Sequence, residues 1–253
     1  MNDTNPFYDG LTDLYHLIYE DWPASIERQG KALDAIIRAD SASAKTVADV
    51  ACGIGTQALG LAARGYDVIA SDISSGAVQR ASREAAGRHL KIEFRVDDMS
   101  RLSTYADGCV DALVACDNAI PHLLSDMEIV GALRQFHRVI KPGGPCVISV
   151  RDYAAVSREP LRFVPYGVRV LPDSRLSLFQ VWEWEGEQYR LHFYFVRDYG
   201  DRVDTQVFRA RYYAVSIETL MQLFAQAGFV NIRRIDDQFF QPVIAAKRPP
   251  PVR

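Results

Sequence analysis

Short apolar runs rich in β-branched residues alternate with helical patterns between residues 46 and 151. Residues 126–140 show the helical pattern clearly, because their large apolar side chains recur three or four positions apart. The sequence Lys-Pro-Gly-Gly at 141–144 should end that helix, since proline cannot continue it and glycine accepts a left-handed cap. The alternation predicts a parallel sheet with helices on both faces. The expected strands are residues 46–51, 67–71, 91–96, 110–116 and 146–151.

The pattern changes to a period of two between residues 160 and 213. Turn sequences at Glu185-Gly186-Glu187 and Tyr199-Gly200-Asp201 interrupt it. We therefore expect a β-meander of antiparallel strands in this segment.

Helical patterns also mark both ends of the chain. Residues 7–38 look helical with aromatic interruptions, and residues 216–227 predict a last helix with Ser216 as its N-cap and a glycine after its end. Two strands should follow, at 229–235 and from about 242 to 247. The second begins at a proline, which cannot donate a hydrogen bond to a strand ladder.

The composition is that of an ordinary soluble globular protein, with 48% hydrophobic residues, 24% charged residues and a formal net charge of −3. This charge gives no reason to expect a nucleic-acid partner. We see no signal-peptide pattern and no apolar run of membrane-spanning length, so we expect a soluble cytoplasmic protein. The cysteines form no CxxC pair, and we expect reduced core residues and no bound metal: Cys52, Cys109, Cys116 and Cys146.

The sequence VADVACGIGTQALGLAARG, residues 47–65, predicts a strand that turns on glycines into a helix. Such a turn is suited to a nucleotide, because the helix N-terminus and its backbone N–H groups attract the ligand's polar groups. The spacing Gly53-x-Gly55-x-x-Ala58 fits NAD as well as S-adenosylmethionine. The glycines alone therefore do not identify the ligand.

Two acidic residues bear on the choice between these ligands. Asp72 ends the second expected strand, where a carboxylate can bind the ribose hydroxyls that both ligands carry. Asp49 lies in the first strand, four residues before Gly53, close to where NAD would place its pyrophosphate. A carboxylate opposes that anion but suits the sulfonium and ammonium groups of S-adenosylmethionine. Asp49 therefore favours S-adenosylmethionine.

More polar residues follow the third and fourth expected strands. After the third strand, Asp98 can reach an adenine amino group and Met99 offers an apolar contact, although Asp97 can take the place of Asp98. The fourth strand ends in a polar cluster at the expected level of the reacting methyl group: Asp117, Asn118 and His122.

These stretches, together with VIKPGGPCVISVRDY (139–153), are similar to the ordered signatures of class I methyltransferases over about residues 46–151. ADVACGIG, CDNAIPHLL, SVRDY and RARYYAVSIETLMQLFAQAGF resemble the matching stretches of the glycine N-methyltransferase family, which includes glycine/sarcosine methyltransferases. The resemblance implies S-adenosyl-L-methionine as methyl donor and S-adenosyl-L-homocysteine as product. It also implies an α/β fold with a doubly wound, seven-stranded, mostly parallel sheet.

In that fold we expect a single methyltransferase domain over residues 1–253. Its four expected parts are N-terminal lid helices (1–45), the S-adenosylmethionine-binding core (46–151), an antiparallel β insertion after the fifth strand that caps the substrate (152–213), and a C-terminal helix with the last two strands (214–253).

The resemblance also implies roles on the acceptor side. The family's asparagine after the fourth strand and its arginine after the fifth hold the amino acid, and they correspond to Asn118 and Arg151. Its histidine corresponds to His122, and its aromatic lid corresponds to the sequence YHLIYEDW. Asp117 departs from the family, where glycine is usual, and Met99 stands where tryptophan is frequent. These departures concern the acceptor and leave the cofactor prediction unchanged.

The expected site combines both lines of inference. The methyl donor is expected to contact Asp49, Ala51, Gly53, Gly55, Asp72, Ile73, Asp98, Met99, Cys116, Tyr19 and Arg28. The acceptor is expected to contact Arg151, Asn118, Tyr15 and Trp22, and the expected catalytic residues are Asn118, His122 and Asp117.

Methyl transfer is an in-line displacement that depends mainly on positioning, and a neutral amine can attack without a dedicated general base. Asn118 can orient an amine and Arg151 can fix a carboxylate through a bidentate fork, whereas Asp117 can attract a cationic acceptor. Each residue also has a purely structural interpretation. Asn118 can be a turn residue, His122 can begin a helix, and Arg151 can pair at the surface with Asp152 or Glu159.

We predict a methyltransferase that modifies a nitrogen of a small-molecule acceptor, possibly one like glycine or sarcosine. The main alternative is N- or O-methylation of a heterocyclic or phenolic secondary metabolite. An NAD-dependent oxidoreductase and a non-catalytic S-adenosylmethionine-binding module remain as alternatives of other classes. We expect no nucleic-acid or membrane partner, and either a monomer or a homo-oligomer.

Overall fold

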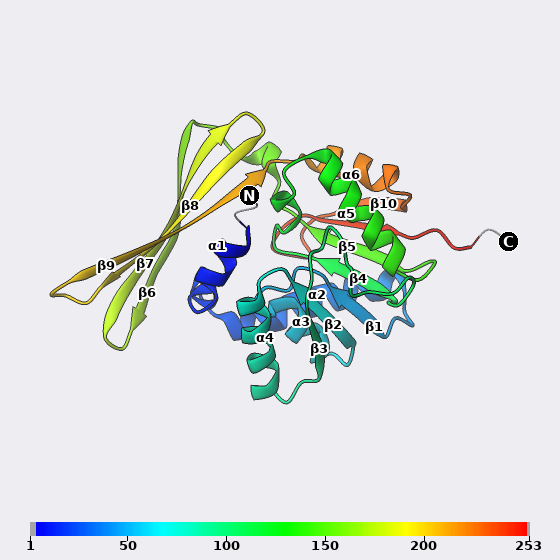
Figure 1. Ribbon diagram of the computed structural model, residues 1–253, viewed down its shortest axis with the longest axis horizontal. Coiled ribbons are helices and arrows are strands. Elements are labelled where there is room, and N and C mark those ends of the chain that lie inside the picture. The colour runs from blue at the N-terminus through cyan, green and yellow to red at the C-terminus, as the bar shows by residue number, and fades with distance from the viewer. Residues whose placement is uncertain (1–3, 252–253) are drawn as a thin grey trace.

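The computed structural model describes residues 4–251 (Figure 1). Its central sheet contains β1 (Thr46–Asp49), β2 (Asp67–Asp72), β3 (Ile92–Val96), β4 (Ala112–Ala115), β5 (Pro145–Ser149), β10 (Val230–Ile235) and β11 (Val243–Lys247). The strand order is β10-β11-β5-β4-β1-β2-β3. Five neighbouring strands, β3, β2, β1, β4 and β5, are parallel. The strand β11 is antiparallel to both of its neighbours, β5 and β10. The predicted seven-stranded, mostly parallel sheet is confirmed.

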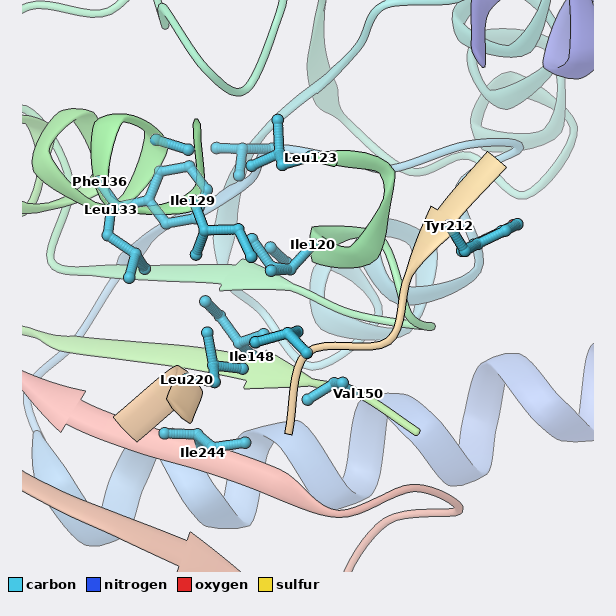
Figure 2. Packing of buried hydrophobic residues seen from close by; sticks show 14 of the residues in the cluster. Ile120, Leu123, Ile129, Leu133, Phe136, Ile148, Val150, Tyr212, Leu220 and Ile244 are labelled. Atoms are coloured by element: carbon cyan, nitrogen blue, oxygen red, sulfur yellow. The ribbon is translucent and has the colours of Figure 1, made fainter. Parts of the chain in front are cut away.

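Helices cover both faces of this sheet. They are α2 (Trp22–Asp40), α3 (Thr56–Ala62), α4 (Ser75–Gly87), α5 (Asp126–Val139) and α6 (Ile217–Gln226). Alternate residues of β1 face opposite layers, because Val47 packs with α2 and α3 whereas Ala48 packs with α5. In Figure 2, Phe136 of α5, Leu220 of α6 and Ile244 of β11 belong to one buried cluster.

The ends of two helices follow the predicted signals. The Ser216 hydroxyl accepts from the backbone N–H of Thr219, which makes it the N-cap of α6 as predicted. The last helix of the parallel part, α5, ends at Val139, just before the Lys-Pro-Gly-Gly sequence. The last strand starts at Val243, directly after the proline.

The N-terminal segment, predicted to be helical with aromatic interruptions over residues 7–38, consists of separate helices. It contains α1 (Thr4–Leu11), a short 3-10 helix at Tyr15–Ile18 and then α2. Asp21 starts α2 by accepting from the backbone N–H of Ala24, and Pro23 occupies the first turn, where its missing N–H is no loss. This cap and the proline break the helix.

A second sheet, which we call the meander sheet, is antiparallel and stands beside the first (Figure 1). It consists of β6 (Leu161–Leu171), β7 (Ser174–Glu185), β8 (Gln188–Asp198) and β9 (Val203–Tyr213), in that order. The predicted antiparallel insertion after the fifth strand is therefore confirmed. Its alternate side chains on one face are buried, and α1 contacts β9 on one side and α4 on the other. None of the helices within residues 4–251 is long and apolar enough to cross a membrane.

Candidate active site

A cavity lies at the carboxyl ends of β1, β2 and β4, and we call it the glycine-loop cavity. The chain order of the strands reverses between β1 and β4, which is where doubly wound sheets bind ligands. Tyrosines of the N-terminal segment close its other side. The expected residues that line it are Ala51, Gly53, Asp72, Ile73, Asp98, Met99, Cys116, Asp117, His122, Tyr15 and Tyr19.

Asp72 joins the end of β2 to the glycine loop. One carboxylate oxygen accepts from the backbone N–H of Gly53 and the other from that of Ser74, both at 2.9 Å. Gly53 has a φ of +50°, a left-handed conformation that favours glycine. Burial raises the pKa of Asp72. Each oxygen keeps a second lone pair, so the carboxylate can still accept ribose hydroxyls.

The structure separates the roles of Asp97 and Asp98. The Asp97 carboxylate accepts from both the backbone N–H and the hydroxyl of Ser103 and Thr104, so it stabilises its own loop. Asp98 lies on the cavity wall beside Met99. Of the two acids, Asp98 is therefore the one placed to reach an adenine amino group.

Asp49 and Gly55 do not line the glycine-loop cavity. Asp49 is fully buried below the loop, because β1 is covered on both faces. Burial raises its pKa to about 7, although the nearby backbone N–H groups of Ala51 and Ala58 act in the opposite direction. Gly55 begins α3 with a φ of +97° and packs on Ala81. Neither residue is therefore on the wall where the donor contact was predicted, and among the described residues the Asp49 carboxylate has no hydrogen-bond partner.

Trp22 was expected to contact the acceptor and Arg28 the methyl donor, but neither residue lines the glycine-loop cavity. Trp22 is buried between α2 and α3, and its indole N–H donates to the Thr56 hydroxyl at 2.8 Å. It therefore supports the cavity wall from behind, since Thr56 lines the cavity. Arg28 donates to Ser25 and lines a surface cleft that shares Tyr19 and Asp117 with the glycine-loop cavity. Because α2 begins at Trp22, the Trp22 side chain contacts α3 and the Arg28 side chain contacts Ser25 of α2 itself.

A second cavity adjoins the first, and we call it the meander cavity. It lies between α1, the ends of β4 and β5, and the buried face of the meander sheet. Tyr8, Tyr15 and Asp117 line both cavities. A ligand in the meander cavity can therefore approach one held in the glycine-loop cavity.

Asn118 fastens the end of β4 to the segment after β5. Its side-chain carbonyl accepts from the backbone N–H of Arg151 at 3.0 Å, and its amide N–H donates to the Tyr153 hydroxyl at 2.9 Å. Asp117 and Asn118 both have left-handed φ angles, +56° and +64°, which is uncommon for consecutive residues other than glycine. Such strained backbone tends to occur at functional sites. Asn118 lines the meander cavity, and its bond to the Arg151 backbone N–H holds that residue in place.

Arg151 reaches the meander cavity from the end of β5. Its guanidinium lies 4.7 Å from the ring centre of Trp182 and donates to the Tyr189 hydroxyl at 3.3 Å. Asp152, one of the surface partners considered above, instead pairs with Arg234 at 2.9 Å. Within residues 7–251, Arg151 forms no ion pair inside 4 Å.

His122 ends a 3-10 helix (Ile120–His122) and is 95% buried, with a relative exposure of 5%. Its Nε2 atom and the Tyr8 hydroxyl form a hydrogen bond of 2.9 Å, and its ring lies 4.2 Å from that of Tyr212. Burial lowers its pKa to about 3, so the imidazole is neutral at physiological pH. A neutral His122 can orient a hydroxyl or an amine but carries no charge to attract an anion.

Several wall residues were missed by the motif analysis. Tyr8 comes from α1, and Tyr166, Gln180, Phe193 and Tyr212 come from the meander sheet. They carry no local motif, and their period-two spacing indicates only that they share a sheet face. Their contribution depends on how the meander sheet folds against β4 and β5.

Comparison with known proteins bears on this site. A methyltransferase-domain family model matches residues 47–144. The glycine/sarcosine N-methyltransferase of Parasynechococcus marenigrum (strain WH8102) is 29% identical over 147 residues, which cover 58% of this chain and about half, 51%, of that protein. The glycine/sarcosine N-methyltransferase of Halorhodospira halochloris is 25% identical over 215 residues, covering 81% of this chain and 79% of that protein.

A solved structure shares the fold. The S-adenosylmethionine-bound CalS10, an amino pentose methyltransferase from Micromonospora echinaspora, superposes with a TM-score of 0.77 at 16% identity. The superposition covers 88% of this chain and 92% of that chain. The strand order and these matches together show the class I S-adenosylmethionine-dependent methyltransferase fold, with a methyltransferase domain matched over residues 47–144 and similarity in sequence to the glycine/sarcosine N-methyltransferases.

Proposed function

We propose that this enzyme transfers the methyl group of S-adenosylmethionine to the nitrogen of a small acceptor that also carries a carboxylate. Arg151 is the observation that carries the proposal. Its guanidinium is packed on Trp182, hydrogen-bonded to Tyr189 and without an acidic partner within 4 Å among residues 7–251. A cation taken out of water is costly unless an anion pairs with it. A carboxylate in the meander cavity would supply that anion, in the bidentate geometry that guanidinium groups favour.

The relatives offer two kinds of acceptor. Two are named for glycine and sarcosine, which combine an amine with a carboxylate, and CalS10 is named for an amino pentose. An amino sugar without a carboxylate would leave Arg151 unpaired, and so would a phenol. The pairing requirement of Arg151 therefore favours the amine that carries a carboxylate.

In the glycine-loop cavity, Asp72 would hold the donor's ribose and Asp98 its adenine, beside Met99. The bound donor supplies a methyl group that its sulfonium already activates. The protein's own task is then to bring a neutral amine in line with that methyl group. Tyr15 and Asp117 lie on the walls of both cavities, where the two ligands would meet.

A panel of acceptors tests the proposal. The purified enzyme is incubated with isotope-labelled S-adenosylmethionine and with glycine, sarcosine, larger amino acids, their decarboxylated amines, an amino sugar or a phenol, and products are identified by mass spectrometry. We expect N-methylation of acceptors with both an amine and a carboxylate. Preferential methylation of the phenol or of the amino sugar would overturn the proposal.

The variant Arg151→Met links the result to the structure. Loss of a charged hydrogen-bond pair, about 1.5–3 kcal/mol, should lower kcat/KM for the carboxylate acceptor roughly tenfold to a hundredfold. Binding of S-adenosylhomocysteine should be unchanged. Arg158→Met is a matched control, because Arg158 also lies over a tryptophan of the meander sheet, Trp184, but pairs with Glu187 outside the cavity.

A further inference from the structure

Asp117 lies at a junction of three spaces. It lines the glycine-loop cavity, the meander cavity and a third space, the outer cleft, which Tyr19, Arg151, Tyr166 and the loop at 237–242 also border. The outer cleft reaches the surface, since Phe240 in that loop is 56% exposed. The Asp117 carboxylate is thus accessible to the donor, to the acceptor and to bulk water.

The two oxygens of Asp117 have different surroundings. Oδ2 accepts from the Tyr19 hydroxyl at 3.0 Å, and the Tyr15 hydroxyl lies at 3.5 Å from the same atom. Its backbone N–H donates to the Ser149 hydroxyl, which fixes the main chain. No hydrogen bond from residues 7–251 reaches Oδ1. One oxygen is therefore held by the lid, and the other is left to a ligand.

The meander cavity also holds two opposite charges that do not pair with each other. Asp117 and Arg151 both line it, but their charged atoms are more than 4 Å apart. Two separated charges in one cavity suit a ligand that carries both charges, with its carboxylate at Arg151 and its ammonium at Asp117. The ammonium end is then the end beside the glycine-loop cavity.

We propose that Asp117 binds the ammonium group of the acceptor through Oδ1 and removes its proton before methyl transfer. This inference rests on the proposed function, because it needs an amine as the methylated group. An ammonium nitrogen has no free lone pair and cannot attack, so a nearby base increases the share of acceptor that can react at neutral pH.

The reaction consists of proton removal and then methyl transfer. An N–H bond of the ammonium breaks, and its proton forms an O–H bond on Asp117. The nitrogen lone pair then forms the new N–C bond, while the C–S bond breaks and its electron pair stays on sulfur. The methylated nitrogen again carries a positive charge, and the proton on Asp117 leaves to water through the outer cleft.

The groups around Asp117 act on its pKa in both directions. Burial raises its pKa, whereas the hydroxyls of Tyr19 and Tyr15 and the charge of Arg151 lower it. Tyr166, across the cleft, stays neutral because burial raises its own pKa. A carboxyl group with a raised pKa takes up a proton more readily than an exposed aspartate does.

The test compares pH profiles of kcat/KM for wild type and Asp117→Asn with one amine acceptor. In the variant, we expect a loss of about a hundredfold near neutral pH, with the difference shrinking as pH approaches the ionisation of the free amine. The Kd of S-adenosylhomocysteine should not change. Asp117→Glu should restore part of the neutral-pH activity, since it restores the carboxylate.

Asp201→Asn is the control. Asp201 is an exposed aspartate in the turn between β8 and β9 and lines none of the three spaces, so it reports the effect of removing a carboxylate away from the site. A uniform loss at every pH in Asp117→Asn, or an equal loss of S-adenosylhomocysteine affinity, would overturn the inference. Failure of the proposed function looks different: wild type would then methylate an amine without regard to its carboxylate, and the pH comparison can be made with that amine.

Discussion

Arg169 should hold the N-terminal lid over the site. It projects from β6, and its Nε donates to the carbonyl of Leu17 at 3.0 Å while Nη2 donates to that of Ile18 at 3.2 Å. These carbonyls end the 3-10 helix that begins at Tyr15, and a cation suits the carbonyl end of a helix. Removing the side chain as Arg169→Ala should therefore release the segment that carries Tyr15 and Tyr19.

The size of the effect follows from these two bonds. A hydrogen bond to a charged group contributes about 1.5–3 kcal/mol, and the partial exposure of Arg169 argues for the lower figure for both bonds together. A loss of about 1.5 kcal/mol shifts the lid equilibrium roughly tenfold toward the open form. If the closed lid is the binding form, the Kd of S-adenosylhomocysteine should rise by up to that factor.

Isothermal titration calorimetry with S-adenosylhomocysteine measures this change directly. Arg169→Lys should recover only part of the affinity, because lysine has no fork to reach both carbonyls. Arg175→Ala is the matched control, since Arg175 lies in the same sheet and pairs with Asp198 at the surface. Equal affinities of wild type and Arg169→Ala for S-adenosylhomocysteine would show that this side chain does not hold the lid closed.

Three further predictions concern the donor site, the contact between α2 and α3, and the loop held by Asp97. Asp72→Ala should weaken S-adenosylhomocysteine binding at least tenfold in the same titration, because both the ribose contact and the support of the glycine loop are lost. Gly30→Ala should lower the free energy of unfolding by about 1–3 kcal/mol in urea titration, since its Cβ would lie 2.6 Å from the backbone of Gly60 where α2 crosses α3. Burial raises the pKa of Asp97, but hydrogen bonds from Thr104 and Ser103 outweigh it and lower the pKa, so Asp97→Asn should be less stable than wild type at neutral pH. The stabilisation by ionised Asp97 is present at pH values above its pKa in the unfolded chain, about 3.9, and is lost as pH falls through its lower pKa in the folded state. The free energies of unfolding of wild type and Asp97→Asn should therefore converge in acid.

The central sheet could be predicted from the sequence because each of its signals is local. Buried parallel strands are short apolar runs, and the polar residue that ends each run marks the edge where ligands bind. Asp72 and Asp98 were found in this way, and both line the glycine-loop cavity. The N-cap of α6 at Ser216 was also readable, since capping depends on a few neighbouring residues.

The remaining features depend on contacts between distant segments. Asp49 has the right position in the chain, but only the path of the loop above it shows that its carboxylate is covered. The break before α2 had a local signal in Asp21 and Pro23, which the aromatic pattern of the segment obscured. Gln180 and Tyr212 reach the site because the meander sheet lies beside the segments that follow β4 and β5, and no motif in their own strands indicates that contact.

The most direct test of the account measures kcat/KM for an amino acid and for its decarboxylated amine, each with wild type and with Arg151→Met. We predict that wild type prefers the amino acid strongly and that the variant loses this preference roughly tenfold or more, with N-methylated products in both cases. A preference of equal size in wild type and variant would contradict the account, because Arg151 would then not be the group that recognises the acceptor.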